Sequence, residues 1–285
     1  MDAPLIAVEQ NRVFIRLAGL GGKGTFSRMV SHDPKEYITA LALKAPVAAI
    51  NRATYRDGEA LPVHEIRVAD VTKDQTFLAD KSAISFVSGV SGQNRLDVLQ
   101  STLLAQLAAN KKFPDATGSL DWCTSFADVL ANIGWVVEGA GVSSYQMKGD
   151  LFQMDTAIIE VLVAAFGQDY LSIIKSTLGS MGKLAKDGRV QVFEKNTHNL
   201  SKGFFQMGLV SESNNAVSLQ LGAFFLSTSD KIENILFFHS SKESSSMEYF
   251  SRKASLTPEI YATIRPTIVA KLGAAVTKYV DEIEI

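Results

Sequence analysis

The sequence has little of several features that would point to a class of function. It holds one cysteine, Cys123, among 285 residues, so no internal disulfide can form. A disulfide-stapled secreted scaffold is therefore excluded. The formal net charge is −2, and the 28 lysines and arginines are spread along the chain. The sequence thus lacks the basic footprint of a nucleic-acid-binding protein, and no basic run indicates an anionic membrane surface.

Long apolar runs are missing too. No run reaches the roughly 18 to 20 residues that span a bilayer. The first four residues, Met-Asp-Ala-Pro, carry no basic stretch followed by an apolar one, so they do not form a Sec signal. We expect a soluble protein that folds in the cytoplasm of the producing cell and leaves it, if at all, by lysis or a signal-less route. With 46% hydrophobic residues it can bury a large core.

The hydropathy pattern changes twice along the chain. Residues 1–90 mix short strands with one helix, for which Asp33 is the predicted N-cap and Pro34 lies in the first turn. Residues 91–187 are mainly helical, and Gly134 ends one of the helices. Helices are expected at residues 34–44, 94–112, 119–133, 155–166 and 168–184, and strands at 13–18, 60–69, 83–88 and 142–147.

Residues 188–285 change to short apolar runs separated by turn residues such as Asn214 and Asn215. Connections this short favour an antiparallel meander. We expect it to be covered by the helix at 94–112 or its neighbours. The predicted strands lie at residues 189–194, 203–211, 216–227, 232–240 and 247–252.

The end of the chain returns to helix. A closing helix starts at Thr257, with a predicted kink at Pro266, and a last helix is expected at residues 276–283. The order of mixed, helical and strand-rich parts predicts an α+β fold rather than a doubly wound sheet. In it the helical middle packs on a C-terminal antiparallel sheet with complicated topology. We expect one compact domain over residues 1–285, with subregions 1–90, 91–187 and 188–285.

A glycine-rich segment follows the first predicted strand. Residues 19–25 read Gly-Leu-Gly-Gly-Lys-Gly-Thr, and such glycines let backbone amides approach a phosphate. A phosphate loop places lysine directly before serine or threonine, whereas Gly24 separates Lys23 from Thr25. The segment is therefore interpreted as a flexible turn.

No metal site is expected. The four histidines have no ligand spacing to one another or to Cys123. Cys123 adjoins Trp122 on a predicted amphipathic helix and is interpreted as a small buried hydrophobe. The histidines are His32, His64, His198 and His239.

Ser91 offers two interpretations. It lies between a predicted strand and a predicted helix, in Gly89-Val90-Ser91-Gly92-Gln93, close to a nucleophile elbow. Gln93 occupies the last position that the sharp turn needs to be small. Ser91 is then either a helix N-cap or the nucleophile of an acyl hydrolase or acyltransferase, with His198 or His239 as its base.

The helices at 155–166 and 168–184 form the most unusual segment. Residues 157–166 are almost wholly apolar, with only Glu160 interrupting. A helix that is apolar all round lies inside a core or meets lipid. Core packing is the first interpretation, and contact with lipid or a bound fatty acid is the second. The candidate lipid contacts in this segment are Ile158, Ile159, Leu162 and Phe166.

Three further stretches are informative together. They are Leu96-Asp97-Val98-Leu99-Gln100-Ser101-Thr102-Leu103-Leu104-Ala105-Gln106-Leu107-Ala108; residues 126–135, with Val129-Leu130 and Gly134-Trp135; and Phe205-Gln206-Met207-Gly208 leading to Leu221-Gly222-Ala223-Phe224. Over roughly residues 97–272 the chain resembles the Erwinia virulence factor (Evf) family. The resemblance implies an α+β fold of complicated topology and a soluble factor that helps bacteria persist in an insect gut.

The same resemblance implies a cysteine that carries a long-chain fatty acid and aids membrane association, near Gly208, Leu209 or Val210. No cysteine stands there. Cys123 lies on a different predicted element and cannot inherit the role by position. Non-covalent fatty-acid binding, with Leu209 among its contacts, is what carries over to this divergent sequence.

The leading hypothesis is therefore a non-enzymatic virulence or host-interaction factor that acts through lipid, fatty-acid or membrane contact. An acyl hydrolase or acyltransferase built on Ser91 is the alternative, and a partner-binding scaffold is the second alternative. No metal, no cofactor other than a fatty acid, and no nucleic-acid partner is expected. The oligomeric state stays open.

Overall fold

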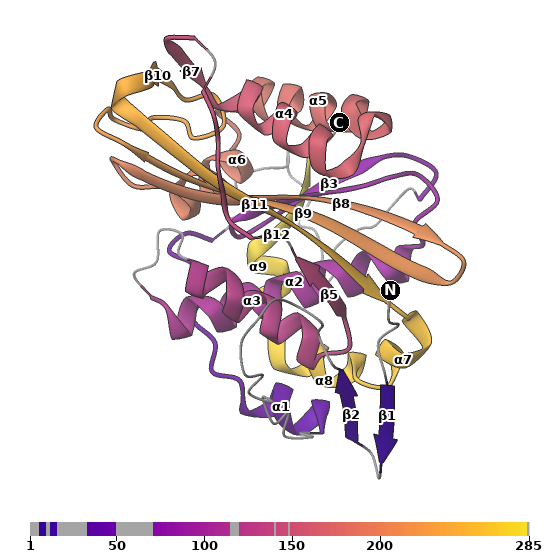
Figure 1. The fold of residues 1–285 in the computed structure, drawn as a ribbon. Coiled ribbons are helices and arrows are strands. Elements are labelled where there is room, and N and C mark those ends of the chain that lie inside the picture. The colour runs from indigo at the N-terminus through magenta and orange to yellow at the C-terminus, as the bar shows by residue number, and fades with distance from the viewer. Residues whose placement is uncertain are drawn as a thin grey trace, which may run out of the picture.

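The computed structural model describes residues 6–9, 12–15, 33–49, 71–114, 120–139, 141–147, 149–283 and 285. In these ranges helices lie above and below a central sheet, so the fold has three layers (Figure 1). The α+β class predicted from the sequence is confirmed. The strand expected at 60–69, the glycine-rich segment 19–25, His32 and His64 lie outside the described residues.

Eight of the described strands form the central sheet, in the order β12-β3-β4-β8-β9-β11-β5, with β6 also paired to β11. Its long members are β8 (Lys202–Ser213), β9 (Ala216–Thr228) and β11 (Ser245–Leu256), which pair antiparallel in sequence order. Asn214 and Asn215 turn β8 into β9 with φ of 50° and 58°. Two positive φ values are what a two-residue hairpin of type I′ requires. Three of the five strands of the predicted C-terminal meander are thus confirmed, with their antiparallel pairing.

The sheet also includes strands that precede and follow this meander in the sequence. β3 (Gln75–Ala79) and β4 (Ser82–Phe86) form a hairpin, and β4 runs parallel to β8, which makes the sheet mixed. β12 (Val280–Ile283) pairs antiparallel with β3. The helix expected at 276–283 is therefore wrong in its second half, since α9 (Ala275–Tyr279) ends where β12 begins. An available sheet edge decided the conformation of those four residues.

The other strands are short. β5 and β6 lie on the outer edge of β11, β7 pairs with β10 in a separate ribbon, and β1 pairs with β2. Only two residues of the strand expected at 142–147 are extended in this way. The bounds are β1 Ile6–Glu9, β2 Arg12–Ile15, β5 Val136–Gly139, β6 Ser143–Ser144, β7 Leu151–Gln153 and β10 His239–Ser241.

One helical layer covers the lower face of the sheet in Figure 1. It is centred on α2 and α3 and completed by α1, α7, α8 and α9. Asp33 caps α1 as predicted, accepting a hydrogen bond from the Lys35 backbone N–H at 2.9 Å. Pro266 lies in the first turn of α8, where proline is tolerated, so it begins a helix rather than kinking one. The bounds are α1 Pro34–Ala40, α2 Gly92–Lys112, α3 Leu120–Asn132, α7 Pro258–Ala262 and α8 Arg265–Leu272.

The upper layer consists of α4 (Met154–Phe166), α5 (Leu171–Lys183) and α6 (Gly188–Thr197). The strand predicted at 189–194 is wrong, because this segment is α6. The alternation Val190-Gln191-Val192 suggested a strand, but Asp187 accepts the Arg189 backbone N–H at 2.8 Å and starts a helix.

The strand predicted at 232–240 is also wrong, apart from its junction with β10. Hydrogen bonds from side chains take the place of strand pairing there. Asn234 accepts hydrogen bonds from the backbone N–H groups of Leu236 and Phe237, both at 3.1 Å, and Glu194 accepts that of Ile235 at 2.9 Å. Backbone donors satisfied by local side chains have no need of a neighbouring strand.

The sheet is buried on both faces, which gives the protein two apolar clusters. Phe204 stacks on Phe225 on the lower face, with ring centroids 4.9 Å apart, and Phe205 stacks on Phe224 on the upper face at 5.1 Å. Two-sided burial explains why β8 is apolar at consecutive positions instead of alternating. Among the described residues, no helix is both long and apolar enough to cross a membrane.

Candidate functional site

The candidate site is the hairpin of α4 and α5, which lies on the upper face of the sheet (Figure 1). Gly167 ends α4 with φ of 108°, a conformation that residues with a side chain rarely adopt, and its N–H bonds to the Val163 carbonyl at 3.0 Å. The single turn Gln168–Tyr170 then leads into α5. The break predicted at Gly167 is confirmed.

The inner side of α4 packs on the sheet. Ile158 and Leu162 are buried in the upper apolar cluster, as the core interpretation predicts. Leu162 lies over Gly222 of β9, where a Cβ would stand 2.5 Å from Leu162 Cδ2. The glycine therefore sets how closely this helix approaches the strand.

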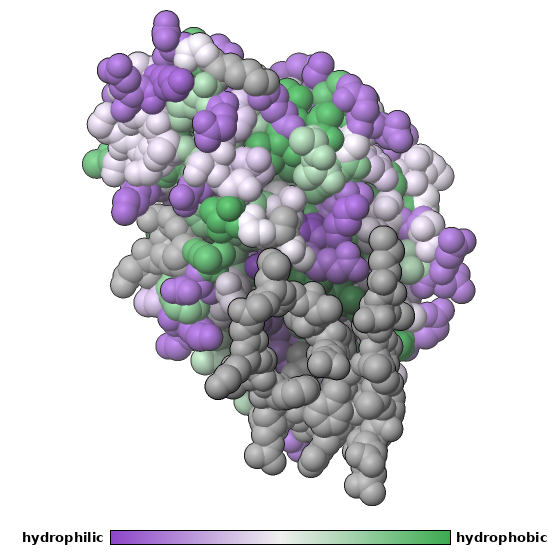
Figure 2. Space-filling view, in the orientation of Figure 1, coloured by the Kyte–Doolittle hydropathy of each residue, from purple (hydrophilic) through white to green (hydrophobic). Residues whose placement is uncertain are grey.

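A second apolar stripe flanks the buried one on α4. Ile159, Val163 and Phe166 are half-buried and pack at the margin of the same cluster. Figure 2 shows apolar side chains among hydrophilic ones at the top of the molecule, where Figure 1 places α4 and α5. α4 thus has a buried apolar stripe and a second one that reaches the surface.

Leu209 lies apart from the other candidate lipid contacts. It is buried on β8, and the alternation of the strand places it on the upper face with Phe205 and Met207. On the neighbouring strand β9, Leu209 pairs with Gln220. Leu209 does not belong to the upper apolar cluster, in which or against which the four candidates on α4 pack. The structure therefore brings four of the five predicted contacts together.

Three buried hydroxyl groups connect α5 to the sheet. The Thr76 oxygen is 2.8 Å from that of Ser85 and 3.1 Å from that of Thr177, and the Ser85 and Thr177 oxygens are 2.9 Å apart. Thr177 comes from α5, Thr76 from β3 and Ser85 from β4. No local sequence pattern predicts this hydroxyl triangle; the one signal for it is Thr177, a polar residue in the apolar stripe of α5.

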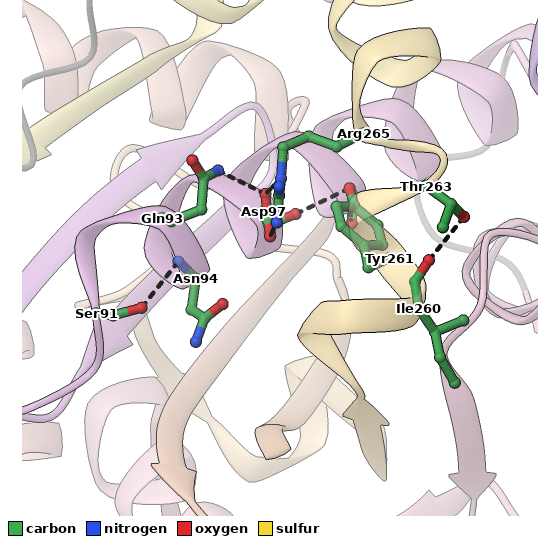
Figure 3. A network of polar contacts seen from close by, with 9 residues as sticks. Ser91, Gln93, Asn94, Asp97, Ile260, Tyr261, Thr263 and Arg265 are labelled. Atoms are coloured by element: carbon green, nitrogen blue, oxygen red, sulfur yellow. Dashed lines mark hydrogen bonds and ion pairs between the residues drawn. The ribbon is translucent and has the colours of Figure 1, made fainter. Parts of the chain in front are cut away.

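Ser91 is an N-cap in the structure, which matches one of its two interpretations (Figure 3). Its Oγ accepts a hydrogen bond from the Asn94 backbone N–H at 3.3 Å. Its own N–H donates to Glu212 at 2.8 Å. In the described part of the chain, neither His198 nor His239 bonds to this hydroxyl; His198 bonds to Glu194 instead, at 3.0 Å.

Asp97, which lies close to Ser91 in the sequence, has a structural role. Asp97 is fully buried and forms an ion pair with Arg265, with Oδ2 and Nη2 2.6 Å apart (Figure 3). The Gln93 side chain donates to the same carboxylate at 2.9 Å. Tyr261 shares a 2.7 Å hydrogen bond with Ser101. These contacts hold α7 and α8 against α2.

Cys123 is buried in the lower cluster, as expected from the sequence. Burial raises the pKa of its thiol above the ordinary value, which disfavours the reactive thiolate. Burial lowers the pKa of His198, but its hydrogen bonds to Glu194 and to the Asn199 carbonyl outweigh that and raise it overall. No group of three His, Cys, Asp or Glu suited to a metal ion occurs in the part of the chain that the structure describes.

A buried acid that no sequence pattern singles out lies in the β3–β4 turn. Asp80 has φ of 52°, and its Oδ2 accepts a hydrogen bond from Asn110 at 2.9 Å. Asn110 in turn accepts one from the Trp122 indole at 2.9 Å. Asp80 Oδ1 is buried without a hydrogen-bond partner. Burial raises the pKa of this carboxyl to about 6, although Lys81 beside it acts in the opposite direction.

Comparison with known proteins gives a likeness of fold. No protein-family model and no curated protein matches the chain. Among solved structures, the Evf virulence factor is similar over 74% of this chain and 85% of its own, at 8% identity and a TM-score of 0.37. A delta-endotoxin is similar over 72% and 95%, at 10% identity and a TM-score of 0.38.

A third similar structure is the activated Cyt2Ba monomer from Bacillus thuringiensis subsp. israelensis. It covers 55% of this chain and 93% of its own, at 12% identity and a TM-score of 0.31. These values relate folds and assign no sequence family. The resemblance to the Evf family noted in the sequence is accompanied by structural similarity at 8% identity, which assigns no family.

Proposed function

We propose that this protein is a non-enzymatic virulence or host-interaction factor that contacts lipid through the α4–α5 hairpin. The observation that carries the proposal is that the apolar surface of α4 extends beyond the stripe that is buried on the sheet. Its inner stripe, with Ile158 and Leu162, lies on the sheet, and its outer stripe, with Ile159, Val163 and Phe166, reaches the surface. A helix of this composition is stable against protein or against acyl chains.

The two stripes have different parts in the proposal. The outer stripe makes the first contact with a bilayer or fatty acid. The inner stripe meets lipid only when the hairpin leaves the sheet, because Leu162 is packed against Gly222. Burying a side chain such as Ile158 or Leu162 stabilises by about 1.5–3 kcal/mol wherever its apolar partner comes from. Acyl chains can therefore replace what the sheet supplies.

The contact of α5 with the sheet supports such a separation. Thr177 meets Thr76 and Ser85 through hydroxyl groups, which water can hydrate once the helix has moved. Apolar side chains in the same places would oppose exposure to water more strongly. The hairpin thus rests on the sheet through an apolar contact under α4 and a polar contact under α5.

The role in the host comes from the resemblance of the three sequence stretches to the Evf family. Membership of that family, persistence in an insect gut and non-covalent affinity for a fatty acid belong to the same proposal. So does release of the protein from the producing cell by a signal-less route.

A disulfide between the hairpin and the sheet tests the proposal. In the double variant Leu162→Cys/Gly222→Cys, a bond would tie α4 to β9, since the native contact is so close. Thiol titration establishes bond formation, and native Cys123 is buried on the other side of the sheet. Vesicle flotation then compares the oxidised and reduced forms. We expect the oxidised form to lose deep vesicle association and the reduced form to regain it.

The matched control is Gly203→Cys/Ile235→Cys, which also pairs a sheet glycine with the aliphatic side chain packed on it. That bond would tie β8 to the loop before β10 and leave the hairpin free. Both of its forms should bind vesicles equally. Equal binding by the oxidised and reduced hairpin variants would contradict the separation, and no vesicle binding by the unmodified protein would leave the partner-binding scaffold as the better hypothesis.

A further inference from the structure

The outer face of α5 is basic. Lys175 and Lys183 lie eight residues apart, so they share a face of the helix with Gly179 between them. Both lysines are exposed, and so is Lys186 in the turn that follows. The sequence holds no basic run here, because the helical repeat and not adjacency gathers the charges.

No acid offsets this charge on its own helix. α5 contains neither aspartate nor glutamate, and none of the three lysines forms an ion pair with a described residue. The exposed positions beside the lysines are small: Ser172, Ser176 and Gly179. The long, flexible lysine side chains therefore project beyond a surface of small residues, which a flat partner can approach closely.

We propose that this face binds an anionic lipid surface, so that the hairpin selects membranes with negatively charged headgroups. The inference rests on the proposed lipid contact and names its partner. A helical unit with lysines on one side and apolar residues alongside suits the boundary between headgroups and acyl chains. Ammonium groups near an anionic leaflet each strengthen binding by about fivefold.

The positions of the acidic residues predict which side of the hairpin faces the membrane. Asp155 and Glu160 lie on α4, and Asp169 lies in the connecting turn. Glu160 accepts a hydrogen bond from the Tyr145 hydroxyl at 2.8 Å, which directs that carboxylate toward the segment after β6. With three acids and three lysines over residues 155–186, composition alone predicts no preference for charge. Their segregation predicts that α5 faces the headgroups.

Vesicle flotation with neutral and anionic lipid tests the inference. The probes are vesicles of phosphatidylcholine alone and of phosphatidylcholine mixed with phosphatidylserine, each at low and high salt. We expect binding to the anionic vesicles to be at least about tenfold stronger at low salt and to approach the neutral value at high salt. The triple variant Lys175→Gln/Lys183→Gln/Lys186→Gln should lose this preference and keep its binding to neutral vesicles.

The control is Lys111→Gln/Lys253→Gln/Lys278→Gln, which removes the same charge from exposed positions on other elements. It should keep the anionic preference. An equal loss in both triple variants would overturn the inference, since net charge alone would then explain the binding. Equal binding of the unmodified protein to both kinds of vesicle would overturn it too and leave the lipid contact standing. Binding to neither would end both proposals.

Discussion

Leu162 of α4 lies so close over Gly222 of β9 that a Cβ on residue 222 would stand 2.5 Å from Leu162 Cδ2. The position on β9 is therefore reserved for glycine by a helix that begins more than sixty residues earlier. Neighbouring Phe224 would also stand within 3.3 Å of that Cβ. The contact makes the seating of the hairpin sensitive to one methyl group.

Gly222→Ala should destabilise the protein by about 1–3 kcal/mol, because α4 must lift or the strand must shift to admit the methyl group. Urea unfolding measures the change. If the hairpin is the lipid contact, this variant should also bind vesicles more strongly than the parent. The matched control is Gly179→Ala on the outer face of α5, where an added Cβ would have no atom within 4 Å beyond its chain neighbours and the backbone of its own helix. It should stabilise by about 0.5–1 kcal/mol through helix propensity. If Gly222→Ala left the free energy of unfolding unchanged, α4 would be able to shift away from the strand at little cost.

A long-chain fatty acid should raise the melting temperature of the delipidated protein. A ligand that binds only the folded form adds about 2.7 kcal/mol at a hundred times its dissociation constant. Leu162→Asp should abolish the rise, and circular dichroism shows whether that variant remains folded. Val163→Asp, at a half-buried position, keeps the test open if the first variant unfolds. A melting temperature indifferent to fatty acids in the parent protein would count against fatty-acid binding.

Ser91→Ala should cost about 0.5–2 kcal/mol, the usual price of a lost N-cap, and leave biological activity unchanged. Ser91→Asn separates the two interpretations, because asparagine can cap the helix but cannot serve as the nucleophile. We expect Ser91→Asn to restore most of the stability. Loss of activity in a stable Ser91→Asn protein would instead support the hydrolase or acyltransferase alternative.

The protein should lose stability as the pH rises through about 6. The folded pKa of Asp80 is raised from 3.8 to about 6 by burial, so native Asp80 binds its proton more tightly than the unfolded chain does. The stability that this proton contributes is complete below pH 3.8 and is lost as Asp80 ionises near pH 6. Ionised Asp80 is buried beside Asn110 and Lys81, with one oxygen unpartnered.

Asp80→Asn tests this directly. Asparagine tolerates the left-handed φ of 52° and keeps an oxygen for Asn110 to donate to. Urea unfolding from pH 4 to pH 8 should show the variant more stable than the parent above pH 6, by about 3 kcal/mol at most, with the difference vanishing toward pH 4. Titration of His198 is common to both proteins and cancels in the difference. Parallel pH profiles would mean that Asp80 does not titrate in this range.

Much of the fold was predictable wherever neighbouring residues decide the conformation. Asp33 before Pro34 marks a helix start, Gly167 marks a helix end, and Asn214-Asn215 marks a hairpin. The candidate hairpin was predictable for the same reason, because its apolar run is continuous in sequence. Its four helical contacts lie together in one cluster, whereas Leu209, taken from the resemblance, lies opposite Gln220 outside that cluster.

The remainder depended on partners far away in the chain. Val190-Gln191-Val192 alternates like a strand, yet the cap at Asp187 and the burial of Val190 and Phe193 on one side make it helical. β12 is extended because β3 offers it an edge two hundred residues earlier. No local pattern contains that information.

The sequence by itself determined the α+β class, the antiparallel meander and the apolar hairpin, since turn chemistry and hydropathy period act over a few residues. The tertiary structure alone decided the parallel pairing of β4 with β8, the hydroxyl triangle beneath α5 and the burial of Asp80. Each of these depends on backbone or side-chain groups that meet only after the chain has folded, and their energies come from burial and hydrogen bonding between segments distant in sequence.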